Sequence, residues 1–152
     1  MSIQRMRDRW YAWVILLGTL GSCGGTSDTH GMDRRTRIKF EQYMVEGEEL
    51  YAVHCLNCHQ DRGQGLAQLY PPLAASDYLL ADIPRAACII KYGQAEEIVV
   101  NGTTYYQKMN AFSKLTNLEI AEILTYITNS WGNEAGIQPV KEVDQWLTHC
   151  EK

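Results

Sequence analysis

The stretch Cys55-Leu56-Asn57-Cys58-His59 decides how the rest of the chain is organised. Two thiols three residues apart, with a histidine directly after the second, form the attachment motif of a c-type haem. Each thiol can add across one vinyl group of the porphyrin, and the short turn brings the imidazole of His59 to the iron as an axial ligand. The motif therefore predicts one covalent haem c, held by Cys55, Cys58 and His59.

Zinc is the main alternative for a CxxC pair. A structural zinc site needs two further Cys or His ligands at a suitable spacing. The nearest unused candidates are Cys88, His149 and Cys150, which form no second compact pair. We therefore prefer haem, and keep a zinc-binding structural lipoprotein as an alternative that a red purified product would exclude.

The N-terminal segment has the pattern of a bacterial export signal. Three arginines between positions 5 and 9 precede an apolar run over residues 10–20. This run is shorter than the roughly 20 apolar residues that span a bilayer. It ends in Leu20-Gly21-Ser22-Cys23, which resembles a bacterial lipobox. We predict a lipoprotein-type signal peptide over residues 1–22, a lipid on Cys23 and a place on the periplasmic face of a bacterial membrane. An ordinary secretory signal with an incidental Cys23 is the alternative.

Charge and length limit the classes of partner and the number of domains. The chain carries a net charge of −4, and residues 1–22 hold three Arg and one Asp, so the remaining 130 residues carry −6. This length suits one small domain. An acidic domain is a poor ligand for nucleic acid, whose backbone requires a basic face, but it can dock on a basic patch of a redox partner protein.

The segment before the motif divides into a tether and a helix. Residues 23–35 are rich in Gly, Ser, Thr and Asp and predict a flexible tether. From residue 36 onward, apolar residues recur at helical spacing up to the motif. They are Ile38, Phe40, Met44, Val45, Leu50, Tyr51 and Val53. The helix therefore leads directly into the attachment turn.

Between the motif and residue 106 the sequence predicts two short helices and a hairpin. Ser76 or Asp77 can cap a helix through Leu80, and a second helix runs from Pro84 to Tyr92 before Gly93. Residues 98–106 contain two β-prone runs joined by Asn-Gly, which is a strong hairpin signal.

The last third predicts two further helices. Thr116 and Glu119 form a capping box, and the helix that they open is expected to end near Trp131 and Gly132. Its expected apolar face comprises Leu118, Ile120, Ile123, Leu124 and Ile127. Pro139 opens a short helix in the tail, and its apolar residues are expected to pack back on the domain. They are Val140, Val143, Trp146 and Leu147.

Met109 is the candidate for the second axial ligand. A thioether is a soft, neutral ligand that favours ferrous iron. The 50 residues from His59 to Met109 allow the chain to wrap the porphyrin and return on its other face. Met44 lies on the helix before the motif, where a core role is expected. A carbonyl of the Pro71-Pro72 segment can accept a hydrogen bond from His59, with a plain rigid turn as the alternative.

At this point the chain resembles a class I, mono-haem cytochrome c over roughly residues 40–133. Gly47 and Tyr51 are similar to the family's glycine and aromatic residue on the first helix. Ile123 and Tyr126 are similar to the aliphatic and aromatic residues of its last helix. The resemblance implies that these four side chains interlock where the two helices cross.

The resemblance extends to the ligands. Pro71 is similar to the proline whose carbonyl holds the proximal histidine, and Met109-Asn110-Ala111-Phe112 is similar to the axial-methionine loop. Asn110 replaces the family's usual proline, which implies a less rigid loop and a more labile iron–sulfur bond. The implied fold is mainly α, with three to five helices around one haem and a β-hairpin insertion before the axial methionine. The domain would cover residues 36–133, and residues 134–152 would form a tail.

The resemblance implies an electron carrier of a bacterial respiratory chain. Metal ligands His59 and Met109 would hold the iron, redox proteins would be the partners, and no small-molecule substrate is expected. No cluster of residues for acid, base or nucleophilic catalysis stands out, so the chain is not expected to be an enzyme. The alternative is a haem-based sensor or weak peroxidase in which the bond to Met109 is labile or absent.

Two cysteines lie outside the motif. In an oxidising compartment Cys88 and Cys150 could form a disulfide that clamps the tail. Because a sequence gives no geometry, we favour two free or buried thiols and keep the disulfide as the alternative.

Overall fold

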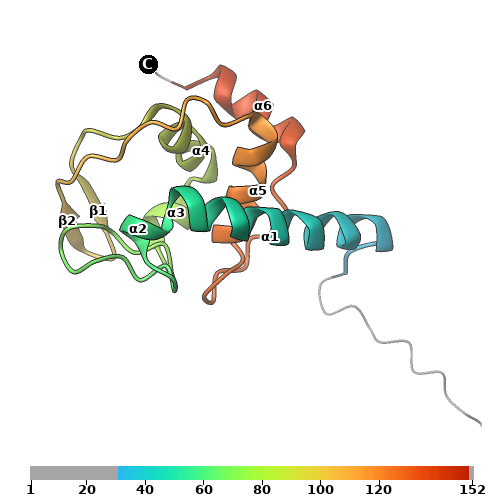
Figure 1. The fold of residues 1–152 in the computed structure, drawn as a ribbon, viewed down its shortest axis with the longest axis horizontal. Helices are drawn as coiled ribbons and strands as arrows, with labels where there is room; N and C mark the ends of the chain where they lie inside the picture. The colour runs from blue at the N-terminus through green and yellow to red at the C-terminus, as the bar shows by residue number, and fades with distance from the viewer. Residues whose placement is uncertain (1–30, 151–152) are drawn as a thin grey trace, which may run out of the picture. The chain divides into compact units, whose positions relative to one another are not determined.

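Helices make up most of residues 31–150, the part of the chain that the computed structural model describes. The elements of this part, in chain order, are α1 (Arg34–His54), α2 (Leu56–His59), α3 (Asp77–Ala81), α4 (Ile83–Tyr92), β1 (Ile98–Val100), β2 (Thr103–Tyr105), α5 (Asn117–Ile127) and α6 (Val140–Thr148) (Figure 1). The predicted mainly helical fold with a short hairpin before Met109 is confirmed. The predicted signal peptide, Cys23 and the tether up to residue 30 lie outside the described residues.

The first helix starts slightly earlier than predicted. Asp33 is its N-cap, and its carboxylate accepts hydrogen bonds from the backbone N–H groups of Arg35 at 2.9 Å and Thr36 at 3.2 Å. These bonds satisfy donors that have no partner inside the helix. The helix therefore begins at Arg34, two residues before the expected start at residue 36.

No helix among the described residues is long and apolar enough to cross a membrane.

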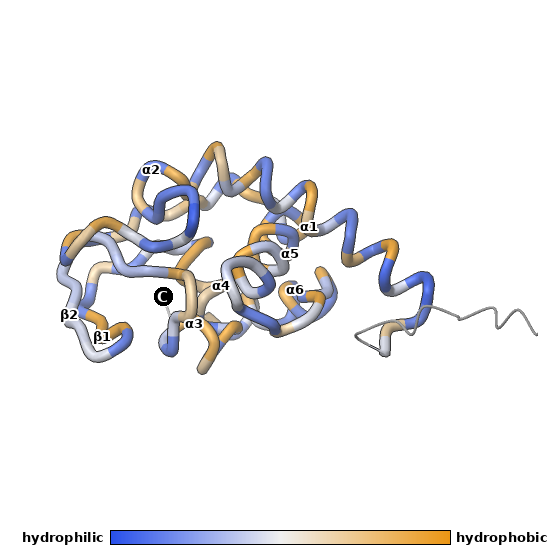
Figure 2. The backbone as a smooth tube through the Cα atoms, turned by 90° about the horizontal axis from the view of Figure 1, so that it is seen from below, coloured by the Kyte–Doolittle hydropathy of each residue, from blue (hydrophilic) through white to orange (hydrophobic). Residues whose placement is uncertain are grey.

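The buried face of α1 includes only some of its apolar residues. Apolar and polar residues alternate along this helix (Figure 2), and the buried positions are Tyr43, Gly47 and Tyr51, at four-residue spacing. The apolar spacing that predicts the helix does not by itself give this face, because Ile38, Val45 and Val53 are 45%, 58% and 71% exposed. Apolar residues occur around more than one face of the helix. The face that carries Gly47 is the buried one, because α5 packs against it.

Gly47 lies where α1 and α5 cross. A Cβ atom at this position would come within 2.7 Å of the Cβ of Tyr126 and would also collide with the backbone carbonyl of Glu122. Tyr51, one turn further along α1, packs its ring 5.4 Å from the ring of Tyr126 and 5.2 Å from that of Trp131. The crossing therefore requires a glycine and is closed by three aromatic rings.

The core is centred on α5. The predicted capping box is present: the Thr116 hydroxyl accepts from the N–H of Glu119, and the Glu119 carboxylate accepts from the N–H of Thr116. The buried residues of the helix are Ile120, Ala121, Ile123, Leu124, Thr125 and Ile127. Leu118 was expected in this set, but it lies in the first turn of the helix and is 45% exposed.

Helix α5 ends at Ile127, before the end near Trp131 and Gly132 that the sequence predicted. The Asn129 amide donates to the carbonyl of Thr125 and to that of Gly136, each at 2.8 Å. Asn129 therefore connects the end of the helix to the incoming tail, and the chain turns before Trp131.

The hairpin adopts the predicted Asn-Gly turn. Ile98 pairs with Tyr105 and Val100 with Thr103, while Asn101 and Gly102 both have positive φ angles, 49° and 75°. Asp77 at the start of α3 fixes the turn: its carboxylate accepts from the Asn101 N–H at 2.8 Å, and its own N–H donates to the Asn101 side chain at 3.1 Å. The hairpin is thereby attached to α3.

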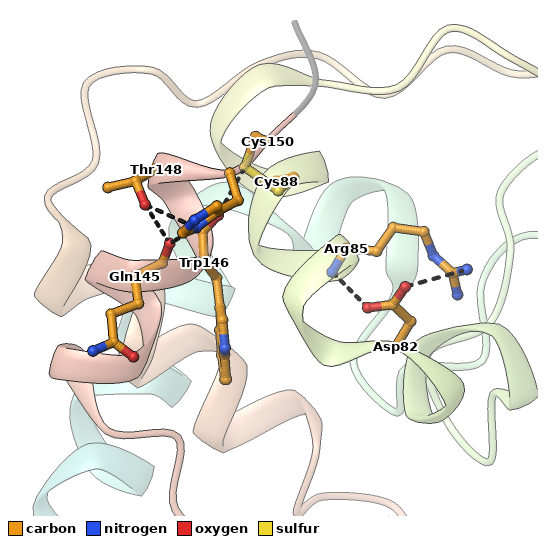
Figure 3. Close-up of a disulfide and its surroundings, with 8 residues drawn as sticks. Asp82, Arg85, Cys88, Gln145, Trp146, Thr148 and Cys150 are labelled. Atoms are coloured by element: carbon orange, nitrogen blue, oxygen red, sulfur yellow. Dashed lines mark hydrogen bonds and ion pairs between the residues drawn. A yellow bond between two sulfur atoms is a disulfide. The ribbon is translucent and has the colours of Figure 1, made fainter.

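The tail packs back on the domain as predicted. Helix α6 contacts both α4 and α5, and Val143 is fully buried. The expectation of free thiols was wrong, because Cys88 of α4 and Cys150 after α6 form a disulfide, with their Cα atoms 5.7 Å apart (Figure 3). Helix α6 packs against α4, which brings together two cysteines that are 62 residues apart in the sequence.

Candidate haem site

The motif cysteines and His59 lie at the junction of α1 and the single-turn helix α2. Cys55 is both the C-cap of α1 and the N-cap of α2, and its carbonyl accepts from the N–H of Cys58 at 3.1 Å and of His59 at 3.0 Å. The hydroxyl of Tyr51 donates to the Gln60 carbonyl at 2.6 Å, so the turn is tied to the aromatic cluster at the helix crossing. Cys55 and Cys58 are both free thiols and half-buried. Burial, with a smaller contribution from Cys58, raises the pKa of Cys55 to about 12.

The His59 ring is buried, with 7% of the residue exposed, and is held in one orientation. Its Nδ1 lies 3.0 Å from the carbonyl oxygen of Pro71. Because a carbonyl oxygen can only accept, Nδ1 carries the proton and Nε2 keeps its lone pair. Burial lowers the pKa of His59, although the hydrogen bond with Pro71 acts in the opposite direction. Burial thus favours the neutral imidazole, whose second nitrogen can bind a metal.

The segment that carries the Pro71 carbonyl is itself fixed by backbone bonds. The N–H groups of Leu73 and Ala74 both donate to the Gly63 carbonyl, at 2.7 and 2.9 Å. A Cβ on Gly65 would come within 2.7 Å of the carbonyl carbon of Pro71. The loop that follows His59 therefore packs directly against the Pro71-Pro72 segment, which we call the proline wall.

Asn133 also fixes this wall, and the sequence reasoning did not identify it. Its side chain accepts from the N–H of Ala75 at 3.0 Å and donates to the carbonyls of Leu73 at 2.9 Å and Ile127 at 2.8 Å. The residue is almost completely buried. It connects the proline wall to the C-terminal end of α5, and no local pattern in the sequence indicates this role.

Met109 lies in an extended segment held by α4 and the residues after it. Its N–H and carbonyl both bond to the backbone of Gln94, at 2.9 and 3.0 Å, and Phe112 donates to the Ile90 carbonyl at 3.0 Å. Gly93 has a φ of 84°, and a Cβ there would lie 2.8 Å from the Met109 carbonyl oxygen. The methionine is thus placed by backbone contacts on both sides of Gly93.

His59 and Met109 line the same two adjoining hollows. One has a volume of about 300 Å³ and the other of about 80 Å³. The residues lining both are Cys55, His59, Pro71, Ile89, Ile98 and Met109. Cys58 lines the larger hollow, whereas Met44 lines neither. The fold therefore brings together the motif, the proline and Met109, and leaves Met44 on α1.

Arg85 lines the smaller, mostly apolar hollow, and its Nη1 lies 3.9 Å from the carboxylate of Asp82. Its guanidinium lies 3.7 Å from the ring centre of Tyr78, and it also donates to the Tyr78 carbonyl. The buried Nε atom has no hydrogen-bond partner. A buried donor without a partner is costly, so this atom fits a ligand that brings an anionic group. A haem, with an apolar ring and carboxylate substituents, fits both the lining and this donor.

The same geometry disfavours the zinc alternative. The disulfide between Cys88 and Cys150 removes both thiols as thiolate ligands. Residues 31–150 contain no group of three or more His, Cys, Asp or Glu side chains placed to hold a metal ion.

Comparison with known proteins gives a match to one family. The family model described as cytochrome c matches residues 44–131, which include the motif, the proline wall, Met109 and α5. This is more than half of the chain.

Two curated relatives are cytochromes c-552 from Thermus thermophilus, the second of them from a named strain of that species. Each is 34% identical over 101 residues, covering 64% of this chain and 76% or 68% of the relative. The cytochrome c subunit of the quinone alcohol dehydrogenase of Gluconacetobacter polyoxogenes is 31% identical over 93 residues, but these cover 20% of that subunit.

Proposed function

The chain belongs to the cytochrome c family, and from this premise we propose that it carries single electrons on one covalent haem c in a bacterial respiratory chain. When bound, the haem supplies an iron that alternates between the ferrous and ferric states. The observation that carries the proposal is that His59 and Met109, 50 residues apart in sequence, line the same apolar hollow next to both motif cysteines. Redox proteins would be the partners.

Each residue of the site has a distinct part in this proposal. Cys55 and Cys58 would form the two thioether bonds, and His59 and Met109 would be the axial ligands. The carbonyl of Pro71 keeps the proton on Nδ1 of His59 and so directs Nε2 to the metal. The Nε–H of Arg85 would donate a hydrogen bond to a carboxylate of the haem.

The electron carrier is favoured over the sensor or peroxidase by how firmly Met109 is held. Both backbone groups of Met109 are bonded to Gln94, so replacing the usual proline with Asn110 leaves the ligand backbone fixed. A carrier needs both axial positions occupied, whereas a sensor or peroxidase needs one open. Asn110 is exposed and makes none of these backbone bonds.

An optical spectrum of the purified holoprotein tests the proposal. We expect a red protein whose oxidised form shows the absorption band of sulfur-to-iron ligation at the red end of the spectrum. The Met109→Ala variant should lose this band and bind external ligands, whereas Met44→Ala, the matched methionine outside the hollow, should keep it. A colourless product would exclude the haem, and a high-spin, ligand-binding wild-type spectrum would favour the sensor or peroxidase.

We also propose that the domain is exported and anchored on the periplasmic face of a bacterial membrane. The support is the sequence pattern over residues 1–23. Metabolic labelling with a fatty acid should mark the wild type and not the Cys23→Ser variant. An unlabelled wild type would leave an ordinary secretory signal as the explanation.

A further inference from the structure

The C-terminal helix is covalently joined to α4 through the Cys88–Cys150 disulfide (Figure 3). Cys150 follows the last turn of α6, whose residue Trp146 also packs against the core. The disulfide therefore adds a covalent link to the packing contacts that already join α6 to α4.

The C-terminal end of α4, one turn beyond Cys88, holds the Met109 loop, which we define as residues 107–113. Helix α4 has ten residues, a length at which an isolated helix is marginal, so tertiary contacts must fix its position. Its last turn and the two residues after it supply the backbone partners of the loop. Ile90 accepts from Phe112, and Gln94 pairs with both backbone groups of Met109.

The contact at Gly93 makes this attachment tight. The carbonyl oxygen of Met109 approaches the Gly93 backbone so closely that a Cβ would lie 2.8 Å away, and Ala111 N would lie 3.0 Å away. A small displacement of the C-terminal end of α4 would therefore move Met109 itself. On the other side, Lys91 donates to the Leu115 carbonyl at 2.6 Å and connects α4 to the segment after the loop.

We propose that the Cys88–Cys150 disulfide is a positioning element for Met109: by fixing α4 against α6, it keeps the loop, and with it the sulfur ligand, in place. This inference rests on the proposed ligation of the iron by Met109. The two cysteines do not touch the hollow, since neither lines it. They act through α4, whose end carries the loop.

The test measures how fast imidazole replaces Met109 in the oxidised holoprotein. Replacement requires the loop to open locally, and the free energy of local opening depends on the contacts that hold the segment. In the Cys88→Ser/Cys150→Ser variant we expect the rate to rise at least about tenfold, because a disulfide restricts the open ensemble. The sulfur-to-iron band should also disappear at a lower temperature than global unfolding.

A matched control separates positioning from loss of stability. Val143→Ala removes two methyl groups from the fully buried side of α6 but leaves the disulfide intact. We expect it to lower the unfolding temperature and to leave the imidazole rate near that of the wild type. Equal acceleration in both variants, in proportion to lost stability, would overturn the inference.

Two further outcomes keep this inference distinguishable from the proposed function. A wild-type protein without the sulfur-to-iron band would overturn both, whereas a wild-type band with an unchanged imidazole rate in the double variant would overturn the positioning role alone. If the double variant does not accumulate, the disulfide of the purified wild type can be reduced and alkylated, and the iron then reoxidised with ferricyanide. The imidazole rate of this protein is compared with that of the untreated wild type.

Discussion

The backbone carbonyl of Glu122 in α5 occupies the space that a side chain on Gly47 in α1 would need. This contact sets how closely the two helices approach. It also sets the position of the attachment turn, because α1 ends at His54, directly before Cys55.

We expect Gly47→Ala to destabilise the holoprotein by about 2–4 kcal/mol, even though alanine is the better helix former, because the crossing must open to admit the methyl group. Chemical denaturation followed by far-UV circular dichroism measures the change. Glu49→Ala, at an exposed position two residues away, should stay within about 0.5 kcal/mol of the wild type. A stabilised Gly47→Ala protein would contradict the described crossing.

Asn133→Ala should cost about 2–4 kcal/mol, because it leaves the Ala75 N–H and the carbonyls of Leu73 and Ile127 without their partner in a buried position. The same denaturation experiment measures it. The control is Asn117→Ala, which removes one surface hydrogen bond to Asp144 and should cost about 1 kcal/mol or less. Similar costs for the two variants would show that the buried network contributes little.

Gly65→Ala should raise the reduction potential of the holoprotein. The added Cβ would press on the Pro71 carbonyl and weaken its bond to Nδ1 of His59, which makes the imidazole a poorer donor to ferric iron. Gly102→Ala is the matched control, because Gly102 also has a positive φ but no atom near its missing Cβ. Spectroelectrochemical titration measures both, and an equal shift in the two variants would exclude an effect through Pro71.

The capping box should make stability depend on acidity. Hydrogen bonds from the Thr116 backbone and hydroxyl lower the pKa of Glu119 below its ordinary value of 4.5. A lowered pKa means that the stabilisation by Glu119 is complete above pH 4.5 and is lost as the pH falls through the pKa of the folded state. Thermal unfolding of the wild type and of Glu119→Gln should therefore differ at neutral pH and converge in acid. A stability difference between the wild type and Glu119→Gln that persists in acid would contradict this role of the Glu119 carboxylate. Thr116→Ala, which removes the N-cap hydroxyl, should cost about 1 kcal/mol at neutral pH.

Features that depend on neighbouring residues could be predicted from the sequence. The capping box at Thr116, the Asn101-Gly102 turn and the helix that opens at Pro139 all form as expected, since each is specified by a few adjacent side chains acting on their own backbone. The haem ligands remain a prediction, supported by the shared hollow.

Other features depend on distant partners and could not be predicted from local sequence patterns. The helical spacing of apolar residues along α1 did not reveal that Val45 and Val53 face outward, whereas the family resemblance correctly placed Gly47 and Tyr51 at the crossing with α5. The roles of Asn133 and of the unpartnered Nε of Arg85 likewise have no local signal.

The sequence by itself determined the attachment turn, the order of the helices and the hairpin, because these follow from short-range hydrogen bonding and backbone preference. Only the tertiary structure decided that Val45 and Val53 of α1 face outward, that Cys88 and Cys150 are joined, and that Asn133 holds the segment after Pro71. These relationships arise only when residues many positions apart are packed together, since both the burial of a face and the meeting of two sulfur atoms depend on where the partner element lies.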